Sequence, residues 1–175
     1  MLPRDFVTAQ PHDGKPHDGK PRPSTRVAAL VQAYLDADYR WELDGRWHPL
    51  SIGGHARELE ATFPQARSFG LLSAWNPHSV ERPEAENREA DEALNTALQD
   101  SGLPYRAAFS SARNRSWREP SWIVMDMPVA DFDALALRFR QLATVHAVAG
   151  EPARLRVYHA PVELSCGGSL VDWLE

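Results

Sequence analysis

The sequence has few of the residues on which many catalytic and metal-binding sites depend. Its 175 residues include one cysteine, Cys166, so an intramolecular disulfide and every zinc motif built on paired cysteines are excluded. Only Lys15 and Lys20 are lysines, and the other 17 of the 19 basic residues are arginines. Outside the N-terminal segment, lysine Schiff-base chemistry and a phosphate-loop lysine are therefore excluded.

Long apolar runs are also absent. No stretch approaches the roughly 18 apolar residues of a membrane span, and the first ten residues, MLPRDFVTAQ, lack the apolar core of a secretory signal. The net charge is −5, whereas broad nucleic-acid binding needs a basic surface. No glycine-rich phosphate loop, paired-histidine zinc helix or calcium loop is present. We expect a cytoplasmic protein with no DNA or membrane partner, no metal and no cofactor.

The sequence divides into three parts. The pentapeptide PHDGK occurs twice in tandem, at residues 11–15 and 16–20, and such proline- and glycine-rich sequence cannot bury enough apolar surface to order itself. We therefore predict a disordered leader over residues 1–23. Residues 24–160 suit one folded domain. Residues 161–175 form a tail whose apolar residues are available for docking.

The N-terminal half of the domain shows three local patterns. Apolar residues recur at helical spacing over residues 27–35, which predicts an amphipathic helix. Residues 39–43 and 46–52 flank Asp44-Gly45, a strong two-residue hairpin signal. Residues 55–63 are typical of a short helix that ends at Pro64.

From Ser68 onward, helices and strands alternate regularly. Residues 69–75 and 122–127 are predicted interior strands, residues 105–111 an edge strand, residues 84–101 and 131–140 helices, and residues 143–148 and 155–158 strands. The order from Ser68 to Val148 is βαββαβ, the ferredoxin-like unit. We therefore predict an α+β sandwich with two helices on one face of an antiparallel sheet. The N-terminal helix and hairpin extend it.

Four polar groups of residues stand at the boundaries of these elements. In a split βαββαβ sheet the two interior strands are antiparallel neighbours, so the end of one lies beside the start of the other. The first helix begins at that edge and the second ends there. We therefore expect the four groups to meet at one rim of the sheet. The candidate ligand-binding residues there are Trp75, Asn76, Asn87, Trp117, Ser121 and Gln141.

Asn87 allows two interpretations. It lies seven residues before Leu94 and eleven before Leu98, on the inward stripe of its helix. A buried amide needs hydrogen-bonding partners, because leaving it unpaired costs roughly 1–3 kcal/mol. Asn76, Asn87 and Glu119 form either a hydrogen-bonding set for a polar ligand or a closed network that fixes the strand end to the helix start.

Glu119 is the candidate catalytic residue. If Trp75, Trp117 and Trp122 surround it, desolvation raises its pKa toward a range useful for proton transfer. The alternative is an ion pair with Arg115 or Arg118. These two arginines belong to a basic loop on an acidic protein, and arginine forks suit phosphate or carboxylate recognition. The alternative is that the loop is a solvated hairpin tip that binds no ligand.

The same residues carry a family resemblance. Residues 69–77 (FGLLSAWNP), Glu86-Asn87, Trp117 with Glu119-Pro120-Ser121, and Phe139 with Gln141 resemble a bacterial family of uncharacterised proteins, DUF3293. The resemblance covers roughly residues 27–148. Ser73 departs from the threonine usual in the family, and residues 109–115 replace a glycine-rich segment. The resemblance implies that the rim residues belong to the family signature, and it implies no activity.

Three functions remain open on this basis. The first is a cytoplasmic binding or regulatory domain whose rim receives a small polar or anionic ligand or a partner segment. The second is a hydrolase or transferase that uses Glu119 as acid or base on an anionic substrate. The third is a scaffold that forms a homo-oligomer through an open sheet edge and has no ligand site.

Overall fold

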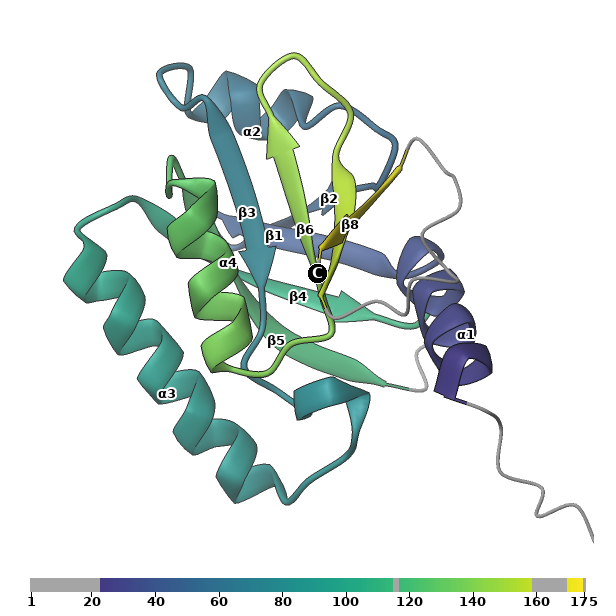
Figure 1. Ribbon diagram of the computed structural model, residues 1–175. Coiled ribbons are helices and arrows are strands. Elements are labelled where there is room, and N and C mark those ends of the chain that lie inside the picture. Colours follow the sequence, from purple (N-terminus) through teal and green to yellow (C-terminus); the bar gives the residue numbers. More distant parts are fainter. Residues whose placement is uncertain (1–22, 115–116, 159–169, 175) are drawn as a thin grey trace, which may run out of the picture.

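The computed structural model describes residues 23–114, 117–158 and 170–174, and it shows an α+β protein (Figure 1). Residues 1–22 of the predicted leader and Cys166 lie outside the described residues, whereas Pro23, predicted as the last residue of the leader, begins α1. In chain order the elements are α1 (Pro23–Leu35), β1 (Asp38–Leu43), β2 (Arg46–Leu50), α2 (Arg57–Thr62), β3 (Ser68–Leu72), the 3-10 helix η1 (Pro77–Ser79), α3 (Glu84–Ser101), β4 (Tyr105–Ser111), β5 (Arg118–Met125), α4 (Val129–Arg138), β6 (Ala143–Val148), β7 (Arg154–Tyr158) and β8 (Val171–Leu174).

The described strands form one sheet in the order β2-β1-β4-β5-β3-β6-β7-β8. All neighbouring pairs are antiparallel except β7 and β8, which are parallel. The prediction that residues 105–111 form an edge strand is wrong, because β4 pairs with β5 on one side and with β1 on the other. The N-terminal hairpin therefore covers the edge that the βαββαβ order alone would have left open.

Local sequence accounts for several element boundaries. Asp44 and Gly45 both have positive φ, 50° and 77°, as the predicted two-residue hairpin turn requires. Helix α3 begins with Glu84 and Glu86 in its first turn and ends at Gly102 with φ 67°, an arrangement that suits the helix dipole and the common glycine stop.

Two strand boundaries differ from the sequence prediction by three or four residues. Strand β3 ends at Leu72 rather than Trp75. Strand β5 begins at Arg118 rather than Trp122, because its first residues pair with the end of β4, with Arg118 opposite Ser111. Residues 118–121 are mostly polar and interrupt the apolar alternation, so the sequence pattern did not reveal their pairing with β4.

The sheet buries apolar side chains on both faces. On one face, Leu72 and Val124 of the sheet pack with Leu94 and Leu98 of α3 and with Phe132 of α4, and Figure 1 shows these two helices along one side of the sheet. The opposite face packs against α1 and α2. That second cluster contains Val31, Trp41, Leu59, Phe69, Leu71, Ile123 and Leu155. Among the described residues, no helix is long and apolar enough to cross a membrane.

Candidate functional site

The polar groups that the sequence places at element boundaries lie together at one end of the sheet. The chain leaves β3 at Leu72, passes through η1 and enters α3 at Glu84. Strand β5, the neighbour of β3, begins at this end with Arg118. Helix α4 has its C-cap at Phe139. We call residues 73–87, 117–121 and 139–141 the rim.

Side-chain hydrogen bonds fix the chain just after β3. The Ser73 hydroxyl donates to the Pro120 carbonyl at 2.7 Å and accepts the Trp75 backbone N–H at 3.0 Å. Asn76 then takes a left-handed backbone conformation with φ 47° and ψ 65°, which asparagine adopts more readily than most residues. The turn aims the Asn76 side chain at β5.

Asn76 and Asn87 form a reciprocal pair. The Asn76 backbone N–H donates to Asn87 Oδ1 at 2.9 Å, and Asn87 Nδ2 donates to Asn76 Oδ1 at 2.9 Å. Arg82 joins them, since its Nε donates to Asn87 Oδ1 at 2.6 Å and its Nη2 to the Ala74 carbonyl at 2.9 Å. Asn87 is only 2% exposed. It therefore holds the start of α3 against the end of β3.

Asn76 also connects this pair to the candidate catalytic residue. Its Nδ2 donates to Glu119 Oε1 at 2.7 Å. Glu119 is half-buried, and burial raises its pKa, an effect that the hydrogen bond from Asn76 partly opposes. The carboxyl group of Glu119 is therefore a stronger proton acceptor than an exposed glutamate.

Gln141 and Ser121 face the same region. Gln141 Nε2 donates to the carbonyls of Trp75 and Phe139 at 3.1 and 3.3 Å. Because a carbonyl accepts only from the amide nitrogen, these bonds fix the orientation of the Gln141 amide. The Ser121 hydroxyl donates to the Glu119 backbone carbonyl at 3.4 Å. Both side chains are buried.

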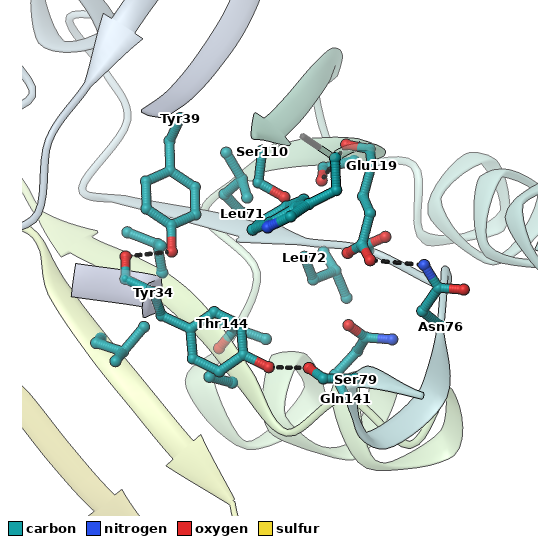
Figure 2. Close-up of a pocket in the computed structure, with 16 residues that line it drawn as sticks. Tyr34, Tyr39, Leu71, Leu72, Asn76, Ser79, Ser110, Glu119, Gln141 and Thr144 are labelled. Carbon is teal, nitrogen blue, oxygen red and sulfur yellow. Dashed lines mark hydrogen bonds between the residues drawn. The ribbon is translucent and has the colours of Figure 1, made fainter. Parts of the chain in front are cut away.

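The rim residues border an inner cavity of about 40 Å³. Figure 2 shows Glu119, Asn76 and Gln141 on one side of it and Tyr34 and Tyr39 on the other. An outer pocket of about 180 Å³ adjoins it, since five residues line both. Those shared residues are Tyr34, Asn76, Ser79, Trp117 and Glu119. The two spaces together form the candidate binding site, which we call the rim cavity.

Helix α1 supplies part of the cavity that sequence reasoning missed. The Tyr34 hydroxyl hydrogen-bonds the Ser79 hydroxyl, and the Tyr39 hydroxyl donates to the Tyr34 carbonyl at 2.8 Å. The helical spacing of residues 27–35 identified Tyr34 as inward-facing. No local signal indicated that α1 packs over the rim, because that position depends on the hairpin pairing with β4. Ser110 and Thr144 also line the cavity.

The three tryptophans expected around Glu119 do not all lie there. Trp117 lines both parts of the rim cavity. Trp75 and Trp122 instead line a separate groove with Phe109 and Arg118. Alternating side chains of a strand point to opposite faces, so the face of β5 that carries Glu119 differs from the one that carries Trp122. The desolvation of Glu119 therefore does not come from that trio.

The predicted arginine partners of Glu119 are also not where expected. The Arg118 guanidinium lies 3.7 Å from the Phe109 ring centroid and 5.5 Å from that of Trp47. Among the described residues, Glu119 forms no ion pair, and the ion-pair interpretation with Arg118 is wrong. Stacking on aromatic rings holds the exposed guanidinium on the other face. Arg115 lies outside the described residues.

Within the described part of the chain, no group of three or more His, Cys, Asp or Glu side chains is arranged to hold a metal ion. The described lining of the rim cavity offers hydrogen bonding from amides and hydroxyls, together with the Glu119 carboxylate, whose pKa is raised by burial. This set suits the recognition of a polar group and, through Glu119, proton exchange with it.

The family comparison covers the segment that carries most of this site. The model of the family described as "Protein of unknown function (DUF3293)" matches residues 72–144, which contain Asn76, Asn87, Glu119 and Gln141. The match confirms over this segment the resemblance predicted from the sequence, so this part of the chain is similar to that family. It is shorter than the predicted span of residues 27–148 and leaves out Tyr34 and Tyr39. No curated protein and no solved structure matches the chain.

Proposed function

We propose that this is a binding or regulatory domain that takes a small polar ligand into the rim cavity. The observation that carries the proposal is the cavity itself. It is bordered by buried or half-buried polar side chains from α1, the β3–α3 connection, β5 and the end of α4. Concave sites with a few convergent polar groups are the usual places for small ligands.

The closed-network interpretation accounts for Asn87 but not for the whole rim. Among the described residues, the side-chain hydrogen bonds of Asn87 all involve Asn76 and Arg82, and Asn87 is not among the residues that line the cavity. Asn76 has both roles, because it bonds Asn87 and also presents its amide to Glu119 beside the cavity. Structural pinning and ligand recognition are therefore divided between the two asparagines.

The raised pKa of Glu119 supports an enzymatic alternative, in which this residue exchanges a proton with a bound substrate. The scaffold alternative has weaker support. Strand β2 is one sheet edge and contains Pro49, and a proline on an edge strand removes a donor that pairing would need.

The order β3-α3-β4-β5-α4-β6 in the chain and β4-β5-β3-β6 in the sheet supports classifying the central unit as ferredoxin-like. A cytoplasmic location and a bacterial source remain predictions from the sequence.

A ligand screen tests the proposal. Small cations, anions and neutral amides or alcohols are added to the protein, and binding is followed by ¹H–¹⁵N NMR of the side-chain amides of Asn76 and Gln141 and the indole of Trp117. We expect at least one class to shift these signals at saturable concentrations. If no class shifts them in folded protein, the proposed function is wrong.

The isosteric variant Glu119→Gln separates binding from catalysis. It keeps an oxygen to accept from Asn76, so the rim remains intact, but it cannot ionise. A binding domain with a neutral ligand retains affinity in this variant. An enzyme instead retains ligand binding and loses turnover of whichever compound the screen identifies. Glu89→Gln, an exposed change on α3, controls for the altered net charge.

A further inference from the structure

Among the described residues, the charged side chains that line the rim cavity are all negative. Among its described lining residues, Glu119 is the one charged side chain of the inner cavity, and Glu81 and Glu119 are those of the outer pocket. An anion entering this space would meet carboxylates and no lining arginine from the described chain. The lining therefore favours a neutral or positively charged ligand over the anion expected from the sequence.

Two arginines of the neighbourhood are directed at protein oxygens. The Arg82 guanidinium donates to Asn87 Oδ1 and to the Ala74 carbonyl. Arg26 Nη2 lies 3.4 and 3.3 Å from the carbonyl oxygens of His78 and Ser79. Neither arginine lines the cavity, so neither neutralises the Glu119 carboxylate from within it.

Several lining groups already donate their protons to protein oxygens, so they offer a ligand only hydrogen-bond acceptors. Both N–H groups of Gln141 donate to backbone carbonyls, which leaves its Oε1 as an acceptor. The single hydroxyl protons of Tyr39 and Ser121 are likewise donated to backbone carbonyls. Glu119 Oε1 accepts from Asn76, and its second oxygen has no protein donor among the described residues.

Gln141 and Glu119 present these acceptors to the same space. Figure 2 shows the Glu119 carboxylate and the Gln141 amide extending toward one another across one end of the cavity. A ligand group placed between them satisfies both only if it donates more than one hydrogen bond. An ammonium group donates three and also carries the charge that complements a carboxylate.

Aromatic rings and volume limit the ligand further. Trp117 and Tyr34 line both the inner cavity and the outer pocket, and cations are attracted to the faces of such rings. A water-sized group needs about 10–15 Å³ of cavity volume. The inner cavity of about 40 Å³ is therefore large enough for an ammonium group and a short aliphatic stem. A larger remainder extends into the outer pocket.

From these observations we propose that the ligand is a small primary aliphatic amine, bound as its ammonium form, with the nitrogen between Glu119 and Gln141 Oε1. This inference rests on the proposed function and specifies its ligand class. Binding requires the carboxylate form of Glu119. Affinity therefore increases as pH rises through the pKa of Glu119, and bound amine lowers that pKa in return.

Three probes of similar size and different charge test the inference. Ethylammonium, acetamide and acetate are titrated separately into the full chain at constant ionic strength, with the NMR signals of Asn76, Gln141 and Trp117 as the readout. Fragments of this size bind in the millimolar range at best, which NMR measures directly. We expect ethylammonium to bind at least tenfold more tightly than acetamide or acetate, and more tightly at pH 8 than at pH 5.

Three glutamate-to-glutamine variants show which carboxylate binds ethylammonium. Glu119→Gln should weaken ethylammonium binding about tenfold or more and abolish its pH dependence, since a charge-assisted bond becomes a neutral one. Glu89→Gln should leave both unchanged. Glu81→Gln should have a smaller effect than Glu119→Gln, because Glu81 is exposed and lines only the outer pocket.

The outcomes separate the two proposals. If acetamide or acetate binds at the rim as tightly as ethylammonium, the amine inference is overturned while ligand binding in the cavity stands. If ethylammonium binding is equally strong in folded Glu119→Gln, the inference is also overturned. If none of the probes and no compound of the wider screen shifts the rim signals, both proposals fall.

Discussion

Replacing Asn87 with alanine is the sharpest test of how the rim is held together. Asn87 is buried in the first turns of α3, yet most of its hydrogen bonds serve residues of the preceding connection rather than its own helix. Asn87→Ala removes this partner and keeps a good helix former at the position. The change therefore isolates the side-chain network from helix propensity.

The structure gives the size of the expected effect. The substitution removes two neutral hydrogen bonds with Asn76, at 2.9 Å each, and one from the half-buried Arg82 guanidinium at 2.6 Å. At about 1 kcal/mol for each neutral bond and about 1.5 kcal/mol for the charged one, the free energy of unfolding falls by roughly 3–4 kcal/mol. For a domain of this size that lowers Tm by roughly 10 °C.

Urea denaturation followed by circular dichroism measures the change, with Gln99→Ala as the control. Gln99 lies on the exposed side of the same helix, so its replacement should change stability by less than about 0.5 kcal/mol. We expect Asn87→Ala to shift the urea midpoint without changing the m-value. A loss below about 1 kcal/mol would refute the reasoning, because it would mean that Asn76 and Arg82 find equivalent partners when Asn87 is absent.

Two further predictions concern the sheet and the carboxyl group. A Cβ added at Gly70 would lie 2.4 Å from the Phe132 ring, so Gly70→Ala should lower stability by roughly 1–3 kcal/mol, and Phe132→Leu in the same chain should recover part of that loss in a double-mutant cycle. Because folding raises the pKa of Glu119, ionisation of this group opposes folding. The contribution of its protonated form to stability is fully present below the ordinary glutamate pKa of 4.5 and is lost as pH rises through the folded pKa. Glu119→Gln should therefore gain stability relative to wild type between pH 4 and pH 8 in urea titrations, and a constant difference between the two proteins would contradict the burial of the carboxyl group.

Local sequence patterns were sufficient to predict much of the fold. The bounds of α3, β4 and β6 agree with the sequence prediction, and α3 combines clear helical periodicity with a local stop at Gly102. The inward position of Asn87 followed in the same way from its spacing to Leu94 and Leu98. These features depend on neighbours a few residues apart, which the sequence displays directly.

The side of the rim cavity formed by Tyr34 and Tyr39 could not be predicted from local sequence patterns. Tyr34 and Tyr39 reach the rim because β1 pairs with β4, with Tyr39 opposite Ser110, which brings α1 with it. Register between strands separated by about 70 residues is decided by the packing of the whole sheet and leaves no local trace. The misplacement of Trp75, Trp122 and Arg118 has a related cause, since the sequence showed that they are near Glu119 but not which face of the sheet they occupy.

Asn76 has two roles at the rim, since it bonds the structural residue Asn87 and also the cavity residue Glu119. Its backbone has positive φ, and so do those of His78 and Ser79, at 54° each; such conformations cost roughly 1 kcal/mol or more per residue unless the surroundings hold them. Asn87 and Arg82 supply that hold, and the same turn brings Asn76 Nδ2 to Glu119. The network thereby fixes one carboxylate oxygen and leaves the other directed at the cavity. A change that loosens Asn87 should consequently weaken ligand binding at Glu119 even under conditions in which the domain remains folded.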